Sequence, residues 1–261
     1  RYIRRAFVKM KKTALLVDIS NSRTKFRLCV NGVIGEELRV LPTNQITEDS
    51  LKKCVSGWLF SSVLISSVVP RAAELVQYAF PSIPVRFVSV TDSLSVDFSE
   101  YAGRDTLGAD RVANVLGAAL SGRFPVVAVD LGTAITFDVL TRDSNKKTQY
   151  RGGVIAPGRA LFQNYLSTNT ALLPAVDSSL DAAPLPIGQN TQQAIQSAGW
   201  YGFRGMIREI ITEISSSLDS KPYVIATGGD AAWAAAQVPE IHEVDPLLTF
   251  RGIMSFLENE S

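Results

Sequence analysis

The sequence predicts an α/β fold of two related lobes, because one strand–turn–strand pattern occurs twice and helical patterns lie between the copies. An apolar strand from Ala14 to Asp18 turns through small polar residues into a second strand, Lys25 to Val30. The pattern returns from Val126 to Asp130, followed by Ile135 to Leu140. The aspartates that end the two first strands are 130 − 18 = 112 residues apart. One duplication, rather than a short solenoid repeat, explains that spacing.

The remaining elements alternate between helical and strand patterns, as an α/β fold requires. The dipeptide Asn31-Gly32 predicts a tight hairpin turn after the second strand. We expect helices at Arg71 to Phe80, Asp110 to Leu120 and Gln192 to Leu218, and strands at Val63 to Val69, Val85 to Val90 and Val224 to Ala226.

The lobe boundary is expected near residue 121, because Arg123-Phe124-Pro125 interrupts the chain before the second hairpin. The N-terminal lobe is then 10–121 and the C-terminal lobe 122–261. Residues 1–9 precede Met10, which opens the natural-looking start MKKTALLVD, and we expect them to be a disordered lead-in. A basic arm for nucleic acid or membrane is the alternative for this segment.

Charge and composition exclude several classes of protein. The chain has 26 basic and 25 acidic residues; residues 1–12 hold six of the basic ones, so the rest has a net charge of 20 − 25 = −5. A mildly acidic body predicts no nucleic-acid partner. No apolar run reaches the ~20 residues of a membrane-spanning helix. Two cysteines and one histidine exclude a disulfide scaffold and a Cys/His zinc site, and they indicate a cytoplasmic location.

The candidate chemistry lies in aspartates at expected strand ends or helix starts: Asp18, Asp110, Asp130 and Asp138. Turns rich in Gly, Ser, Thr and Asn can point backbone N–H groups at a phosphate, and an adjacent carboxylate can hold hydrated Mg²⁺. Ordinary strand ends with turn-forming residues are the alternative for either turn alone. The repetition of the arrangement favours a nucleotide site, although the P-loop and dinucleotide glycine motifs are absent.

Asp110 and Arg111 have both a functional and a structural interpretation. Asp110 could cap the expected helix, or it could be a general base that takes a proton from an attacking hydroxyl. Arg111 could bind an acidic group of the substrate or spread transition-state charge. The lone His242 is expected to be structural or at the surface, and Cys29 and Cys54 are expected to be small core residues.

Three glycines, Gly199, Gly202 and Gly205, repeat every third residue in the expected long helix. Glycine costs helix stability, so its repetition predicts close approach of another backbone. That backbone could belong to the other lobe or to a second copy of the chain.

The motifs together resemble type III pantothenate kinases, a family of the acetate kinase, sugar kinase, Hsp70 and actin superfamily. The resemblance runs in order over nearly the whole chain from Ala14. It rests on seven blocks: Asp18 to Lys25; Gly108 to Arg111 with Asn114, Gly117 and Ala118; Asp130 to Ala134 with Thr136 and Asp138; Gly152 to Gly158; Leu172 to Pro174; Gly188 to Thr191; and Thr227 to Gly229.

The resemblance implies two ribonuclease-H-like lobes of the actin-like ATPase type, with mixed sheets flanked by helices. It implies transfer of the ATP γ-phosphoryl group to pantothenate, with Mg²⁺, with K⁺ or NH₄⁺, and in a homodimer. Asp110 matches the catalytic base and Asp130 the monovalent-cation ligand. The implied ATP contacts are Asp18, Ile19, Ser20, Asn21, Ser22, Arg23, Thr24, Lys25 and Thr133. The implied pantothenate contacts are Tyr101, Gly108, Ala109, Asp110, Arg111 and, from the neighbouring subunit, Thr191.

One residue departs from the family pattern, because Ser20 stands where the family has glycine. Glycine would allow a positive φ and close approach of a phosphate, whereas serine adds a side chain and a hydroxyl donor. A non-catalytic nucleotide-binding relative and a phosphotransferase for another hydroxylated acceptor are the alternatives to the kinase.

Overall fold

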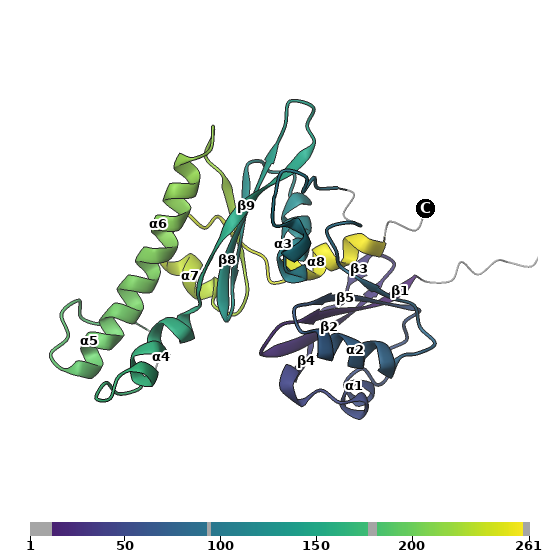
Figure 1. Ribbon diagram of the computed structural model, residues 1–261, viewed down its shortest axis with the longest axis horizontal. Helices are drawn as coiled ribbons and strands as arrows, with labels where there is room; N and C mark the ends of the chain where they lie inside the picture. The colour runs from purple at the N-terminus through teal and green to yellow at the C-terminus, as the bar shows by residue number, and fades with distance from the viewer. Residues whose placement is uncertain (1–11, 93–94, 177–181, 258–261) are drawn as a thin grey trace, which may run out of the picture. The chain divides into compact units, whose positions relative to one another are not determined.

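The computed structural model describes residues 12–92, 95–176 and 182–257, and they divide into two compact units (Figure 1). The first unit comprises the chain up to residue 89 together with residues from 253 onward, and the second comprises 90–252. The expected lead-in at residues 1–9 lies outside the described residues.

The first unit contains a six-stranded mixed sheet covered by two helices. Strand β1 pairs antiparallel with β2, which also pairs with β3 and β4, and parallel with β5, which pairs with β6. Alternate residues of β1 point into the core against helices α1 and α2, as the two-residue period of a strand requires. The elements are β1 (Thr13–Ile19), β2 (Arg23–Val30), β3 (Val33–Ile34), β4 (Arg39–Pro42), α1 (Glu48–Cys54), β5 (Ser62–Ser67), α2 (Pro70–Ala79) and β6 (Val85–Phe87).

The second unit repeats this strand order in a five-stranded sheet. Strands β7, β8 and β9 form an antiparallel meander, and β10 and β11 add in parallel on the other side of β7. The shared order confirms the predicted α/β fold of two related lobes. The strands are β7 (Val126–Leu131), β8 (Ala134–Arg142), β9 (Thr148–Pro157), β10 (Tyr223–Thr227) and β11 (Glu243–Val244).

Helices cover both faces of the second sheet. Helix α3 (Ala109–Ala119) contacts β7 and β8 on one face, whereas α6 (Phe203–Ser216) and α7 (Ala231–Gln237) pack on the other. Helix α8 (Leu248–Met254) crosses α3 at backbone contact: a Cβ at Gly117 would lie 2.2 Å from the carbonyl oxygen of Leu248. Only glycine permits this approach, which fixes α3 against the sheet.

Division of the chain by contacts differs from the lobes expected at 10–121 and 122–261. Helix α3 precedes residue 121 in the sequence but packs on the second sheet, so contacts place it in the second unit. The two units are defined by which residues pack together, whereas the expected lobes are defined by the repeat in the sequence. The packing therefore does not test the boundary at residue 121, which stays a prediction.

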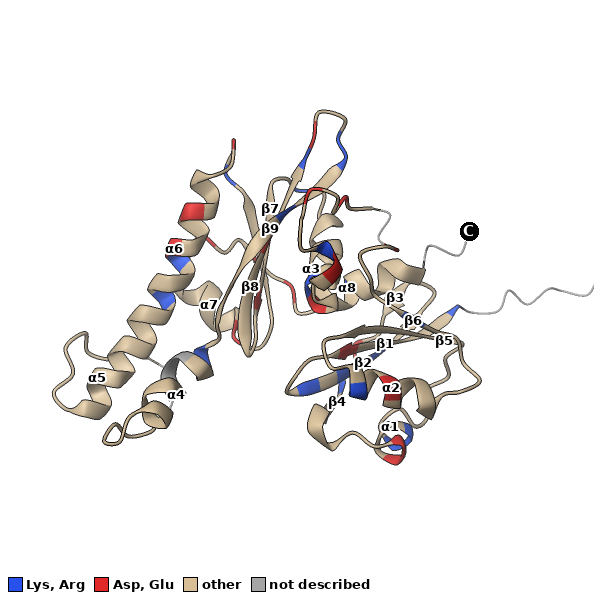
Figure 2. Cartoon of the chain, viewed as in Figure 1, with Lys and Arg blue, Asp and Glu red and all other residues tan. Residues whose placement is uncertain are grey.

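The expected long helix from Gln192 to Leu218 is helical but not uniformly α-helical. It consists of α5 (Thr191–Ser197), a π-helical turn (Ala198–Gly202) and α6. A Cβ placed at Gly205 would have no atom within 4 Å, so this glycine meets no other backbone among the described residues. Another segment, α4 (Arg159–Asn169), contacts the π-helical turn. Figure 2 shows α5 without a charged side chain.

The rare residue types are structural, as the sequence predicts. Cys29 is fully buried and Cys54 half-buried, and burial raises the pKa of both thiols. The Nδ1 atom of His242 accepts a hydrogen bond from the backbone N–H of Val224 at 3.0 Å, and its ring stacks on Tyr223. Within the described ranges, no helix is both long and apolar enough to span a bilayer.

Candidate functional site

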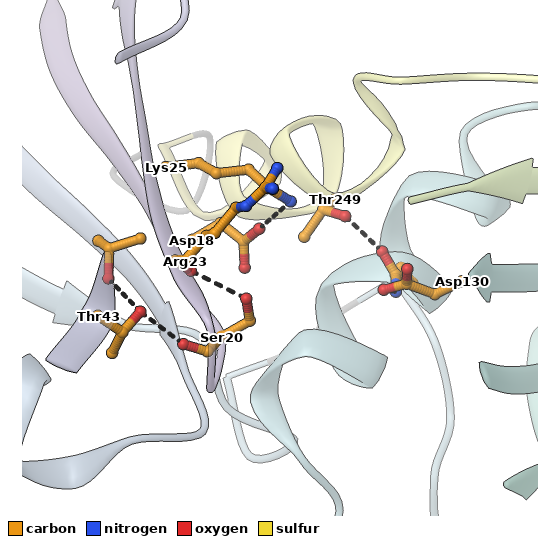
Figure 3. Close-up of polar contacts among 9 residues, drawn as sticks. Asp18, Ser20, Arg23, Lys25, Thr43, Asp130 and Thr249 are labelled. Atoms are coloured by element: carbon orange, nitrogen blue, oxygen red, sulfur yellow. Dashed lines mark hydrogen bonds and ion pairs between the residues drawn. The ribbon is translucent and has the colours of Figure 1, made fainter. Parts of the chain in front are cut away.

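The turn between β1 and β2 in the first unit is held from both sides. The backbone N–H and the hydroxyl of Ser20 both donate to the carbonyl oxygen of Arg23, at 3.1 and 2.9 Å (Figure 3). The Thr43 hydroxyl donates to the Ser20 carbonyl oxygen at 2.7 Å, and the Thr43 backbone N–H donates to the Ser22 carbonyl oxygen. These bonds give the turn a fixed shape before any ligand arrives.

Serine fits the backbone at position 20. Among the described residues, a positive φ at a residue other than glycine occurs at Asn31 and Lys146 and not at Ser20. The freedom that glycine would supply is therefore not needed here, and the hydroxyl adds a bond that closes the turn. Ser20 gives no support to the alternative of a non-catalytic relative.

A cation and an anion stand side by side at the base of this turn. Asp18 and Lys25 are cross-strand partners, and Lys25 Nζ lies 3.1 Å from Asp18 Oδ2 (Figure 3). The Asp18 side chain is almost fully buried and that of Lys25 is about one-third exposed. The pair offers a lysine to anionic oxygens and a carboxylate to a hydrated cation.

The other residues of the 18–25 segment divide into exposed and buried ones. Asn21, Ser22 and Arg23 are exposed. Ile19 and Thr24 are fully buried, and the Thr24 hydroxyl contacts that of Thr43 at 3.0 Å. These two buried side chains pack beneath the turn in the core, so Ile19 and Thr24 can contact a ligand only through their backbone atoms.

In the second unit, Asp130 is the next-to-last residue of β7, and two polar side chains hold its carboxylate in place. Asn114 Nδ2 donates to Asp130 Oδ2 at 3.0 Å, and the Thr249 hydroxyl donates to Asn114 Oδ1 at 2.7 Å (Figure 3). Thr249 is a site residue that sequence reasoning missed. It lies far along the chain in α8 and has no motif around it, so only the packing of α8 on α3 identifies it.

Two glycine-containing turns meet beside Asp130. A Cβ at Gly228, where φ is +95°, would lie 2.6 Å from Asp130 Oδ1 and 2.5 Å from the Leu131 carbonyl oxygen. The Asp230 N–H donates to that carbonyl oxygen at 3.1 Å. Thr133 is exposed at the tip of the β7–β8 turn, and its carbonyl oxygen accepts from the Gly158 N–H at 3.0 Å.

The start of α3 excludes the structural interpretation of Asp110 as a helix cap. The N-cap is Gly108, with no side-chain cap bond, and Asp110 is the second residue of the helix. Asp110 Oδ1 accepts from the backbone N–H of Arg111 at 2.8 Å. The carboxylate is half-buried at the mouth of the helix rather than tied across its end.

Arg111 turns inward from α3 into a buried polar cluster. Its Nε and Nη2 lie 3.0 and 2.8 Å from Asp138 Oδ1, and Nη2 also donates to the hydroxyl oxygen of Tyr150 at 2.8 Å. Asp138 sits within β8 with no exposed surface, so the expectation that it ends a strand is wrong. Tyr101 packs edge-on against Tyr150, with ring centroids 5.1 Å apart.

Thr191 is not brought to this cluster. It is the first residue of α5, exposed, and follows the N-cap Asn190, whose side chain accepts from the Gln193 N–H. Helix α5 continues through the π-helical turn into α6, on the face of the sheet opposite α3 (Figure 1). Within the second unit, Tyr101 and Arg111 are therefore close together, and Thr191 is apart from them.

Comparison with known proteins identifies relatives that match most of the length of the chain. The family model of type III pantothenate kinases matches residues 14–213. Proteins named type III pantothenate kinase from Akkermansia muciniphila and Methylacidiphilum infernorum are 41% and 33% identical to the chain. Each match covers 92% of this chain, with 96% and 86% of the relative covered.

Solved structures show the same fold at lower identity. A Baf family protein from Campylobacter jejuni has a TM-score of 0.59 at 22% identity, over 94% of this chain and 98% of that one. A glucokinase from an Antarctic psychrotroph has a TM-score of 0.50 at 11% identity, over 95% and 99%. These likenesses concern the fold, which is two ribonuclease-H-like lobes.

The junction beside Asp130 gives a stability prediction. Gly228→Ala forces a Cβ against Leu131 and Asp130 at a positive φ, and we expect it to lower the free energy of unfolding by about 1–3 kcal/mol. The neighbouring Gly229→Ala is the control, because a Cβ there meets nothing within 4 Å, and its effect should stay within about 0.5 kcal/mol. Urea denaturation measures both, and equal effects would contradict the described junction.

Proposed function

The chain belongs to the type III pantothenate kinase family, and from this premise we propose how its residues divide the work of the reaction. The reaction is ATP-dependent phosphorylation of pantothenate to 4′-phosphopantothenate, the first step of coenzyme A biosynthesis. Phosphoryl transfer depends mainly on positioning and charge neutralisation, so it needs neither a histidine nor a P-loop.

Asp110 is the general base, and its position at the start of α3 is the observation that carries this assignment. It is not the N-cap residue of the helix, and the next residue, Arg111, turns into the protein. Asp110 takes the proton of the primary hydroxyl as that oxygen forms its bond to the γ-phosphorus. The bond to the β–γ bridging oxygen breaks, and the electron pair leaves with ADP.

The turn over residues 18–25 binds the phosphates of ATP, and Thr133 is a further ATP contact. The backbone N–H dipoles of a turn rich in small polar residues and the Lys25 ammonium supply positive charge. Asp18 is the one carboxylate at this turn, which suits Mg²⁺, an ion bound through one or two carboxylates plus substrate phosphates. Mg²⁺ neutralises charge on the phosphates when it is bound.

Asp130 is the ligand of a monovalent cation, K⁺ or NH₄⁺. Asp130 Oδ2 accepts a hydrogen bond from the Asn114 amide, and Asp130 Oδ1 and the Leu131 carbonyl oxygen both lie beside Gly228. No group of three or more His, Cys, Asp or Glu suited to a metal occurs among the residues that the structure describes. One carboxylate with carbonyl oxygens suits an ion of single charge, which adds positive charge beside Asp130.

Pantothenate is held by Tyr101 and the segment from Gly108 to Arg111, and by Thr191 of a second copy of the chain. Within one chain, Thr191 lies on the opposite side of the sheet from α3, so the substrate site is incomplete without a partner. Residues 160–176 and 182–203 contain no Lys, Arg, Asp or Glu. A cavity of about 730 Å³ lies between α4 and the π-helical turn. Leu161 and Tyr165 are among its lining residues, and both are exposed.

This uncharged surface is the proposed homodimer interface, because large exposed apolar patches mark association sites. The three glycines that repeat through the π-helical turn and α6 adjoin it, and Gly205 has open space above it for a partner's backbone. A cytoplasmic location stays a prediction from the cysteine content.

Asp110→Asn tests the base. The variant keeps the size of the side chain but cannot accept the proton, so kcat should fall about a hundredfold to ten-thousandfold. Asp105→Asn, a fully exposed acid in the preceding 3₁₀ turn, is the control and should keep its activity. An ATP-dependent pantothenate phosphorylation assay measures both. Full activity in Asp110→Asn would refute the assignment.

Replacing the cation tests Asp130. Turnover of the wild-type protein should be higher in K⁺ or NH₄⁺ than in Na⁺ at equal ionic strength. In Asp130→Asn this preference should disappear and turnover should be low in every salt, because the charged ligand is gone. Asp143→Asn, in the exposed turn after β8, should keep the preference. A preference that persists in Asp130→Asn would place the cation elsewhere.

Light scattering tests the dimer. The chain weighs 28.3 kDa, so a homodimer should have a mass of about 2 × 28.3 = 56.6 kDa. Tyr165→Glu places a charge on the uncharged surface and should give the monomer mass with loss of activity, since Thr191 no longer reaches a partner's site. Tyr78→Glu, at a similarly exposed tyrosine of α2, should stay dimeric. A fully active monomer would overturn the proposal.

A further inference from the structure

The buried cluster beneath α3 contains two residues that have no part in the reaction described above. Asp138 lies in β8 and Tyr150 in β9, and both are almost fully buried. The Tyr150 O–H donates to Asp138 Oδ1 at 2.8 Å, the same oxygen that Arg111 contacts. Two side chains, from α3 and β9, thus converge on one carboxylate oxygen of β8.

Stability alone does not explain this cluster. Removing two opposite charges from water costs about as much as their attraction returns, so a buried ion pair is weak evidence for a stabilising role. Its geometric effect is definite: Nε and Nη2 of Arg111 are both engaged, and the plane of the guanidinium is therefore set. The Nη1 atom takes part in neither bond.

The neighbouring backbone is shaped to receive the guanidinium. A Cβ at Gly153 would lie 2.7 Å from Arg111 Nη2 and 2.0 Å from the Phe137 carbonyl oxygen, so only glycine fits there. At Gly152, where φ is +106°, a Cβ would lie 3.6 Å from the ring of Tyr101. The Tyr150 ring packs against the Tyr101 ring, so Tyr150 contacts both of the proposed pantothenate-binding side chains, Tyr101 and Arg111.

The ionisation states follow from the surroundings. Burial raises the pKa of Asp138, and the ion pair with Arg111 opposes that shift. Burial lowers the pKa of the Arg111 guanidinium, but the charge and hydrogen bond of Asp138, together with Tyr150 and Tyr101, outweigh it, so the pKa is raised. Burial and the charge of Asp138 raise the pKa of Tyr150, which keeps its hydroxyl protonated as the donor.

We propose that Asp138 and Tyr150 are positioning residues that aim the Arg111 guanidinium at the carboxylate of the acceptor substrate. This inference rests on the proposed function, in which Tyr101 and Arg111 hold pantothenate and Asp110 receives its hydroxyl proton. Pantothenate carries its carboxylate at the end opposite its primary hydroxyl. The adjacent residues Asp110 and Arg111 thus address the two ends of one molecule.

Tyr150→Phe is the decisive variant, since it keeps the aromatic packing and removes only the hydroxyl. The KM for pantothenate should rise about threefold to tenfold, the effect of one lost hydrogen bond within the cluster, while the KM for ATP stays within about twofold. Tyr223→Phe removes a tyrosine hydroxyl bonded to Glu243 in the same unit and is the matched control. Its two KM values should not change.

A double-mutant cycle separates positioning from general support of the fold. In an Arg111→Gln background, Tyr150→Phe should change the pantothenate KM by less than about twofold, because the residue it acts through is gone. The same cycle with Asp138→Asn is expected to agree. An equal effect of Tyr150→Phe in both backgrounds, or a lower Tm with an unchanged pantothenate KM, would overturn the proposal.

Calorimetric titration with pantothenate gives the same comparison without turnover. The Kd should rise in Tyr150→Phe as the KM does, and an unchanged Kd would count against positioning. Wild-type protein that binds pantothenate but does not phosphorylate it would contradict the proposed roles in catalysis and leave the binding comparison decisive for Arg111.

Discussion

The second unit is organised around the ion pair of Arg111 and Asp138. The pair joins the first turn of α3 to the centre of β8, and Tyr150 extends it to β9. Because the guanidinium is buried beside the carboxylate, the surrounding backbone must leave room for it. Gly153 supplies that room, and the close crossing of α3 and α8 at Gly117 holds the helix in register with the sheet.

Duplication of the fold has placed an aspartate at the end of the first strand of each unit, and the two now have different surroundings. Asp18 faces a lysine on the neighbouring strand, whereas Asp130 faces an amide held by a threonine. The same strand position therefore has a charged partner in one unit and a neutral hydrogen-bond donor in the other. This difference is the basis for the separate roles that we propose for the two aspartates.

The sequence was sufficient for features that depend on local patterns. Strands β1 and β7 and helix α3 follow from short apolar runs and a 3.6-residue period, and the hairpin at Asn31-Gly32 has the positive φ angles expected of that dipeptide. The order of the motifs located the turn at residues 18–25 and the start of α3. Each of these features is determined within about ten residues of chain.

Features that depend on packing between distant segments could not be predicted. Tyr150 carries no motif, and it joins the site because β9 pairs with β8 and brings its hydroxyl beneath α3. Asp138 shares its residue type with the strand-end aspartates, yet it lies between Phe137 and Val139 in the middle of a strand that runs on to Arg142. The π-helical turn was also not predicted. Its glycines indicate a weakened α-helix, but they do not indicate whether a π-helical turn, a kink or a loop takes its place.

A crystal structure with pantothenate bound tests the account most directly. The account predicts the substrate carboxylate at about 2.7–2.9 Å from Arg111 Nη1, with the guanidinium still on Asp138 and Tyr150. It also predicts the primary hydroxyl at about 2.6–3.2 Å from the Asp110 carboxylate. A substrate whose carboxylate lies away from Arg111, or whose primary hydroxyl faces another group, would contradict it.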